Sequence, residues 1–204
     1  MKIFRIKRAV SSQNVTKYVE FKIDVTSPWV NEDLYVNKYS EKHELPIPLY
    51  TENKLTPEDY PYSGNAHIVS KRFLDVIKKL NSDFEAFESV VYYKGKNQKA
   101  YCKQSGNADG KIWDNFYTMI FPEYNLFNWD ESDYETDYVY GTNEKFVSRI
   151  NKLVVNIKEN EKISNNNFLI LGEFSLYLLC TEKAKLAIEE AGLTGISFEE
   201  VEVM

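Results

Sequence analysis

The stretch FLILGEFSLYLLCTEKAKLAIEEAGLTGISFEEVEV, residues 168–203, gives the clearest order of structural elements in this chain. Its first part is rich in β-forming residues, and Gly172 favours a turn or bulge there. Thr181 is a suitable N-cap for the helix EKAKLAIEEA, and Gly192 is a suitable residue to end it. The closing LTGISFEEVEV predicts a C-terminal strand. The stretch therefore combines strands and a helix that can pack on one another.

A second helix is predicted at about residues 70–80, where Ser70 can cap the run KRFLDVIKKL. Its apolar residues form one stripe at helical spacing: Phe73, Leu74, Ile77 and Leu80. Further strands are predicted in KIFRI, KYVEFKIDV, FEAFESVVYYKG, KIWDNFYTMIF and LVVNI. We expect residues 95–110, which are polar and rich in Gly and Asn, to form a loop or hairpin tip.

Strands outnumber helices and do not alternate with them regularly, which predicts an α+β fold. We expect a mostly antiparallel sheet with helices at about residues 70–80 and 182–191. Five of the six prolines lie between Ser27 and Tyr62. We therefore divide the chain into a β-rich and proline-rich region, residues 1–62, and an α+β domain, residues 63–204. The two could still form one compact unit.

The composition excludes several classes of function. The net charge is −6 and the pI is about 5.1, whereas direct nucleic-acid binding needs clustered Lys and Arg. No window approaches the 18 apolar residues of a membrane span, and the N-terminus does not resemble a signal peptide. We expect a cytoplasmic protein without direct nucleic-acid or membrane partners.

The sequence also lacks the motifs of the common catalytic and metal sites. Cys102 and Cys180 are not in metal-ligand spacing, and we predict reduced thiols, with Cys180 in the core. We interpret His43 as a solvated loop residue and His67 as a hydrogen-bonded one near the helix start. No phosphate-binding loop or nucleophile elbow is present. We expect no metal, no cofactor and no enzymatic activity.

The most unusual segment runs from Ile112 to Glu144. It contains eight carboxylates and ten aromatic residues but no Lys or Arg, while the rest of the chain has 25 basic and 23 acidic residues. Aromatic side chains bury much area with little loss of rotamer freedom, and carboxylates attract a basic partner. The segment therefore predicts a protein-recognition surface.

Other interpretations of this segment remain open. The pattern after Asp130 lacks the glycine and the spacing of a calcium loop. A glycan hydrolase would use two of the carboxylates, and a carbohydrate-binding module would stack sugars on Trp129. The aromatic residues before Asp130 are expected to be core, with the acids on solvated loops: Trp113, Phe116, Phe121 and Phe127.

Three motifs in this order resemble a bacterial family of immunity proteins from polymorphic toxin systems, formerly a domain of unknown function and typified by a myxobacterial immunity protein. The motifs are an IVS helix start, an aspartate-x-serine segment followed by an aromatic residue, and a closing LTGIxF. They fall on the following residues: Ile68, Val69 and Ser70; Asp130, Ser132 and Tyr134, where the spacing between serine and tyrosine differs from the typical one; and Leu193, Thr194, Gly195, Ile196 and Phe198.

The resemblance covers about the last two thirds of the chain and implies a cytosolic protein that neutralises a cognate toxin without catalysis. It implies that Asp130 and Ser132 hold the fold. The acidic and aromatic residues would cover the active site of the toxin, for which a basic nuclease is one candidate. The candidate toxin-binding residues are Trp129, Asp130, Glu131, Asp133, Tyr134, Glu135, Asp137, Tyr138 and Tyr140.

Overall fold

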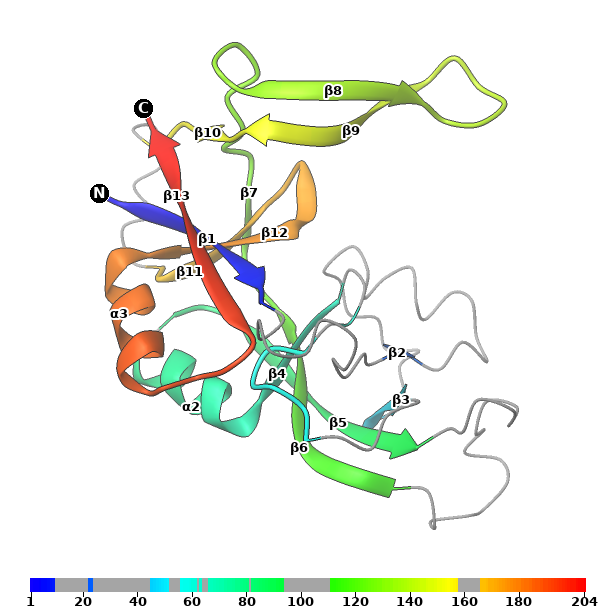
Figure 1. Ribbon diagram of the computed structural model, residues 1–204, viewed down its shortest axis with the longest axis vertical. Helices are drawn as coiled ribbons and strands as arrows, with labels where there is room; N and C mark the ends of the chain where they lie inside the picture. The colour runs from blue at the N-terminus through cyan, green and yellow to red at the C-terminus, as the bar shows by residue number, and fades with distance from the viewer. Residues whose placement is uncertain are drawn as a thin grey trace.

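The computed structural model describes residues 1–9, 22–23, 45–51, 56–61, 63, 66–80, 82–93, 111–157 and 166–204. Its elements form two larger sheets, a separate two-stranded ribbon and two helices (Figure 1). Parts of the predicted KYVEFKIDV strand, the loop at 95–110, His43 and Cys102 lie outside the described residues.

The six-stranded sheet brings both ends of the chain together. Its order is β10 (Val154–Val155), β13 (Ile196–Val203), β1 (Ile3–Arg8), β12 (Phe174–Thr181), β11 (Phe168–Leu171) and β7 (Glu123–Tyr124). β1 pairs antiparallel with both β12 and β13. The first strand of the chain therefore lies in the middle of a sheet whose other long strands, β12 and β13, come from the C-terminal end of the chain.

β11 is buried on both faces, which explains the continuous apolar run FLIL in its sequence. Successive residues of β11 point into different cores: Phe168 and Ile170 pack with the helices, while Leu169 and Leu171 pack on the opposite face. The turn between β11 and β12 includes Gly172, and the register shifts beside it. The predicted turn or bulge at this glycine is confirmed.

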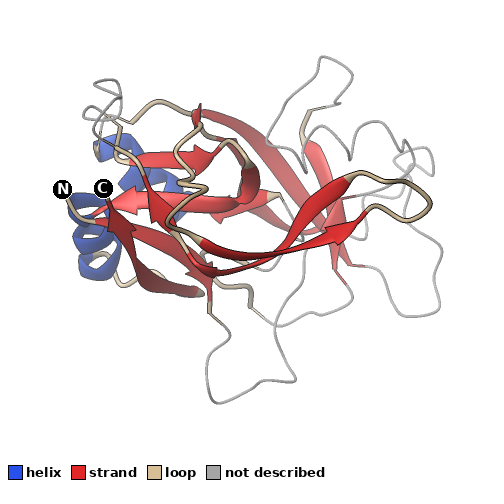
Figure 2. Cartoon of the chain, turned by 90° about the horizontal axis from the view of Figure 1, so that it is seen from above, coloured by secondary structure: helices blue, strands red, loops and turns tan. Residues whose placement is uncertain are grey.

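The five-stranded sheet has the order β2 (Lys22–Ile23), β3 (Ile47–Thr51), β5 (Glu85–Tyr93), β6 (Lys111–Ile120) and β4 (His67–Ser70). β4 leads directly into helix α2 (Lys71–Lys79), and β12 leads into α3 (Glu182–Glu190). The two helices lie side by side beneath the six-stranded sheet (Figures 1 and 2).

The helix predictions agree closely with the structure. The Ser70 and Thr181 side chains accept hydrogen bonds from the third residue after them, as N-caps do. Gly192 has a φ of +59°, as expected after a helix end. In α3, Ala184 and Ile188 are buried while Leu186 is 57% exposed, so the helix buries only a narrow apolar face.

The described strands and helices agree with the predicted α+β class. The sheets are mixed, because three of the strand pairs are parallel: β10 with β13, β11 with β7, and β3 with β5. No helix in the described part of the chain is long and apolar enough to cross a membrane. The domain boundary at residue 62 stays a prediction.

Several strands were not predicted, among them both strands of the ribbon, β8 (Asp133–Tyr138) and β9 (Lys145–Lys152), which pair with each other. The strand predicted at LVVNI begins after β9, and its paired part is β10. Six of the eight β9 residues are exposed, so this strand lacks the buried alternation that sequence patterns detect. Between β7 and β8, Phe127 makes an isolated bridge to Val155.

Candidate functional site

The β8–β9 ribbon carries most of the predicted recognition residues and stands apart from the two larger sheets (Figure 1). The acidic residues after Ser132 were expected on loops, but they lie on β8. The expected loop conformation of these residues is therefore wrong. In a strand, successive side chains point to opposite faces, so alternate acidic residues of β8 share one face.

An aromatic cluster anchors the base of the ribbon. The Phe127 ring lies 4.7 Å from that of Trp129, 5.7 Å from that of Tyr134 and 5.0 Å from that of Phe174, between ring centroids. All three pairs meet edge to face, the arrangement that the quadrupoles of aromatic rings favour. Trp129 is nevertheless 49% exposed, so one side of its ring remains available to a ligand.

Two polar side chains fix the chain just before β8. The Ser132 hydroxyl donates to the Val154 carbonyl at 3.2 Å and accepts from the Val154 amide at 3.1 Å. The Asn128 side-chain oxygen accepts from the amides of Asp130 and Glu131, each at 3.1 Å. The predicted structural role of Ser132 is thus confirmed.

The predicted core role of Asp130 is wrong. Asp130 is exposed, and only its backbone amide takes part in the turn. The buried aspartate of this fold is Asp59, which is 6% exposed and was not singled out in the sequence. Its position in the proline-rich stretch gave no periodic signal.

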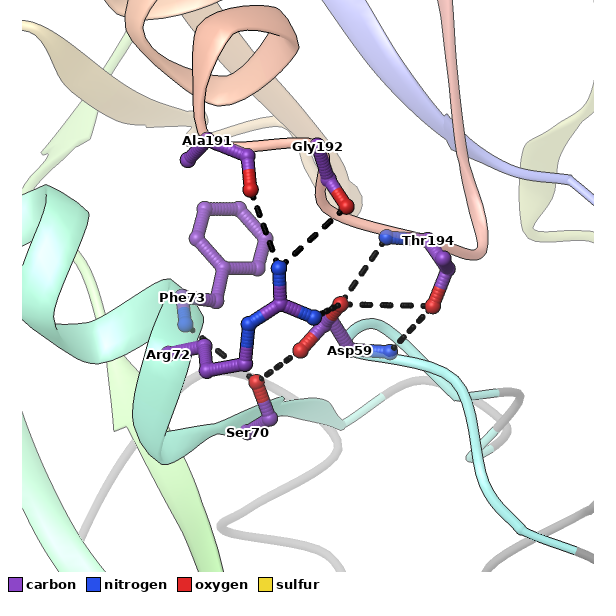
Figure 3. Close-up of polar contacts among 7 residues, drawn as sticks. All are labelled: Asp59, Ser70, Arg72, Phe73, Ala191, Gly192 and Thr194. Carbon is purple, nitrogen blue, oxygen red and sulfur yellow. Dashed lines mark hydrogen bonds and ion pairs between the residues drawn. The ribbon is translucent and has the colours of Figure 1, made fainter.

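Asp59 joins two of the three motifs that carry the family resemblance (Figure 3). Its carboxylate accepts from the Ser70 hydroxyl at 2.5 Å, and from the amide and the hydroxyl of Thr194 at 2.9 and 3.2 Å. Arg72 donates to the same carboxylate at 3.1 Å and reaches the carbonyl of Ala191 at 2.9 Å. The IVS helix start and the LTG turn are therefore held to each other through one buried carboxylate.

The LTG turn itself requires glycine at its last position. Gly195 has a φ of +77°, and a Cβ there would lie 2.7 Å from the Glu58 side chain and 2.9 Å from the Tyr60 carbonyl oxygen. The Tyr60 carbonyl group belongs to the backbone, so it cannot move away from a Cβ at residue 195 as a flexible side chain could. These contacts explain the motif as a packing requirement of the fold, so the recognition surface is expected elsewhere.

The ribbon combines an acidic strand with a basic one. β8 carries Asp133, Glu135 and Asp137 but no base, whereas β9 carries Lys145, Arg149 and Lys152 but no acid. Glu135 lies 4.0 Å from Arg149, with both side chains more than half exposed. The neutralising partners of the acidic segment thus lie on the strand that follows it in the sequence.

This neutralisation is incomplete. Lys152 forms its ion pair with Glu202 at 2.9 Å, and the Lys145 ammonium lies 5.5 Å from the centroid of the Tyr138 ring. Among the described residues, no ion pair joins Asp133 or Asp137 to a base. β8 therefore keeps negative charge on its surface.

The far end of the ribbon is an exposed apolar tip. We define the tip by four residues with large side chains, of which Tyr140 is fully exposed: Tyr138, Val139, Tyr140 and Phe146. The tip lies on the side of the molecule away from the two helices (Figure 2). Val139 and Phe146 were not among the predicted residues, because Val139 is neither acidic nor aromatic and Phe146 lies after the acidic segment.

Hydrogen bonds close the turn that presents Tyr140. The Thr142 amide donates to the Val139 carbonyl at 3.0 Å, and the Val139 amide donates to the Glu144 carbonyl at 2.9 Å. Gly141 has a φ of +79°, as the third residue of a type II turn requires. The exposed tyrosine is therefore held on a defined backbone and loses little freedom on binding.

The predicted site residues thus form two groups along one ribbon. Trp129 and Tyr134 lie in the aromatic cluster at its base, and Tyr138 and Tyr140 lie at its tip. The carboxylates lie on the exposed surface before and along β8: Asp130, Glu131, Asp133, Glu135 and Asp137. Because all five are exposed, the structure gives them none of the partial burial on which a glycosidase acid depends.

Three other titratable side chains among the described residues are buried in the core. The Tyr60 hydroxyl lies 2.8 Å from Nδ1 of the buried His67, and burial raises the pKa of Tyr60. Cys180 is fully buried, and this burial raises its pKa, which keeps the thiol protonated. The described residues contain no group of three or more His, Cys, Asp or Glu that could hold a metal ion.

No family model matches the chain, and no curated protein sequence matches it either.

Proposed function

We propose that this protein is an immunity protein that binds a cognate bacterial toxin domain and blocks its active site without catalysing a reaction. The observation that carries the proposal is the exposed apolar tip on a turn closed by hydrogen bonds. The resemblance of three motifs to the immunity family supplies the class of partner. A protein surface that buries the tip would remove four large apolar side chains from water.

The charge of the ribbon supports a basic target, such as the active-site cleft of a nuclease. The unneutralised carboxylates of β8 would attract such a cleft and speed association. The aromatic side chains of the tip would then slow dissociation, since buried aromatic residues commonly dominate binding energy. The two parts of the ribbon thus have separable kinetic roles.

The tip is tested by binding to the toxin domain encoded in the neighbouring reading frame. We expect Tyr138→Ser with Tyr140→Ser to raise Kd about 30-fold or more, the loss expected for a hot spot of about 2 kcal/mol. Leu186→Ser is the matched control, because Leu186 is 57% exposed on α3. Equal loss of affinity in the control and the tip variant would contradict the proposed site.

The charged part is tested by association rates at low and high salt. Asp133→Lys with Asp137→Lys should slow association and reduce its dependence on salt, while dissociation changes less. Glu189→Lys with Glu190→Lys, on two exposed residues of α3, is the charge-matched control. An unchanged salt dependence in the β8 variant would show that steering arises elsewhere.

The half-exposed ring of Trp129 favours one second candidate, a carbohydrate-binding module. Its ring could stack on a sugar while Phe127 and Tyr134 hold it in place. This function predicts glycan binding that Trp129→Ala abolishes and that needs no toxin. Binding of the unmodified protein and of Trp129→Ala to a glycan array separates the carbohydrate-binding function from the immunity function.

A further inference from the structure

The ribbon has one strand edge without a partner. Among the described residues β8 pairs only with β9, so the opposite edge of β8 presents backbone N–H and C=O groups to solvent. In Figure 1, β8 is the strand of the ribbon farther from the two larger sheets. An extended chain could therefore approach this edge without meeting the rest of the molecule.

The two strands of the ribbon differ in regularity. Consecutive residues of β8 pair with β9, whereas the two register shifts leave Ser148 and Asn151 of β9 without a partner in the ladder. Bulges of this kind twist an edge and disfavour further pairing. β9 is thus the irregular strand, and β8 offers a regular edge of six residues from Asp133 to Tyr138.

The charge on β8 selects what could pair with this edge. Asp133, Glu135 and Asp137 alternate along the strand, so they share one face. A residue directly opposite each of them on an added strand would have its Cβ about 5 Å away on the same face. Opposite charges stabilise such pairs, and like charges destabilise them.

The ribbon contains a model for this pairing. On its occupied edge, Asp133 and Glu135 face Lys152 and Arg149 in the ladder. Lys152 is nevertheless engaged by Glu202, and Glu135 lies 4.0 Å from Arg149. Glu135 also accepts a hydrogen bond from the Asn151 side chain at 3.1 Å, on the Oε1 that faces Arg149, and Asp137 Oδ1 accepts from the Tyr138 amide at 2.8 Å. Among the described residues, Glu135 and Asp137 thus each keep one carboxylate oxygen, and Asp133 both, for bases on a second strand.

We propose that the free edge of β8 takes up an extended segment of the partner protein, with Lys or Arg at alternate positions, as a third strand of the ribbon. This inference rests on the proposed function and specifies how the partner is held. Backbone hydrogen bonds would supply affinity, and the alternating bases would supply selectivity and register. A second copy of β8 is disfavoured as the occupant, because it would add three carboxylates and no base to an edge that already carries three carboxylates.

The probe for the test is a labelled peptide with lysine at alternate positions, KVKTKV, added to the intact protein. We expect saturable binding by fluorescence anisotropy, and slower hydrogen exchange at those β8 amides that do not bond to β9. A peptide with glutamine in place of its three bases should bind about tenfold or more weakly. A peptide methylated on alternate backbone nitrogens should not protect the β8 amides.

Variants of the protein complete the test. Asp133→Asn, Glu135→Gln and Asp137→Asn together should weaken peptide binding about tenfold or more, while Glu144→Gln in the turn should have little effect. Binding without protection of β8 amides, or with loss of protection in β9, would overturn strand addition. Equal binding of the basic and glutamine peptides would overturn the charge selection.

These results are distinguishable from failure of the proposed function. If the tip variants lose toxin binding but the peptide does not add to β8, the ribbon is the binding site and strand addition is wrong. If the peptide adds to β8 but neither the tip nor the β8 variants affect toxin binding, the edge is real and the immunity function is wrong at this site.

Discussion

Asp59 connects segments that are far apart in the sequence through four hydrogen bonds to its carboxylate. The residue is buried, whereas its cationic partner Arg72 is 61% exposed in its side chain. Solvent therefore screens the ion pair. Most of the stabilising effect should come from the bonds to Ser70 and Thr194, which are shielded from water.

We expect Asp59→Asn to lower the free energy of unfolding by about 3 kcal/mol. With its oxygen towards Arg72 and Thr194, the amide would turn its NH2 group towards the Ser70 hydroxyl, which then loses its acceptor, and the bonds to Arg72 and Thr194 would lose the negative charge that strengthens them. Urea denaturation measures the change. Asp75→Asn is the control, because Asp75 pairs only with Lys71 on an exposed helix face and should contribute at most about 0.5 kcal/mol.

The burial of Tyr60 leads us to expect a lower free energy of unfolding at alkaline pH. Its pKa is raised above the ordinary 10.0 chiefly by burial, with Arg8 acting in the opposite direction. Below the unfolded-state pKa both states hold the proton and the stabilisation is complete. As the pH rises towards the folded-state pKa, the unfolded state loses its proton first, so the protein becomes less stable.

The free energy of unfolding should therefore fall between about pH 9 and about pH 11, by at most about 1.4 kcal/mol per pH unit from this residue. Tyr60→Phe should show a weaker dependence on pH in this window, although the loss of the bond to His67 lowers its stability at neutral pH. Denaturant midpoints at several pH values test both effects. Parallel curves for the two proteins would contradict the role of Tyr60.

At the scale of elements, the sequence predicted the helices best, because their capping residues and apolar spacing lie within the helix or directly beside it. Ser70 and Thr181 are caps with a residue-specific mechanism, and their helices begin where predicted. β9 was missed because its stability comes from pairing with β8 and from a few contacts at the ribbon base. A two-stranded ribbon has only one neighbour for each strand, so no buried face imposes a pattern on its sequence.

The same argument predicts that the ribbon depends on its aromatic base. Tyr134→Ala removes the contacts with Phe127 and Trp129, whose ring centroids lie 5.7 and 5.5 Å from that of Tyr134. We expect faster hydrogen exchange throughout β8 and β9, with little change in β11 and β12. Thr136→Ala, on an exposed residue of the same strand, is the control. Uniform loss of protection in all sheets would show that the ribbon does not open separately.

At the scale of the whole molecule, the sequence indicates the acidic segment as a candidate site, but it does not show which bases lie beside these acids in the fold. The acidic segment stands out because it contains no base between Ile112 and Glu144. The bases that lie beside it come next in the sequence, on β9, and only the hairpin brings Arg149 to Glu135. The hydrogen bonds of Asp59 could not be predicted for the same reason, since Thr194, which donates to its carboxylate, is 135 residues away in the sequence.

The position of β1 gives the last prediction, which concerns how the ends of the chain depend on each other. β1 separates β12 from β13, and its Ile3 and Phe4 are buried in different cores. Deleting residues 1–8 would expose both neighbouring strand edges and remove side chains from both faces of the sheet.

We therefore expect the truncated protein to lose cooperative unfolding and the dispersed amide spectrum of a folded domain. Ile3→Ala with Phe4→Ala, in the full chain, should destabilise by several kcal/mol, roughly the sum of two core truncations. Lys2→Gln is the control, because its pair with Glu200 is exposed on both sides. A truncated protein that retained cooperative unfolding would show that the six-stranded sheet forms without its first strand.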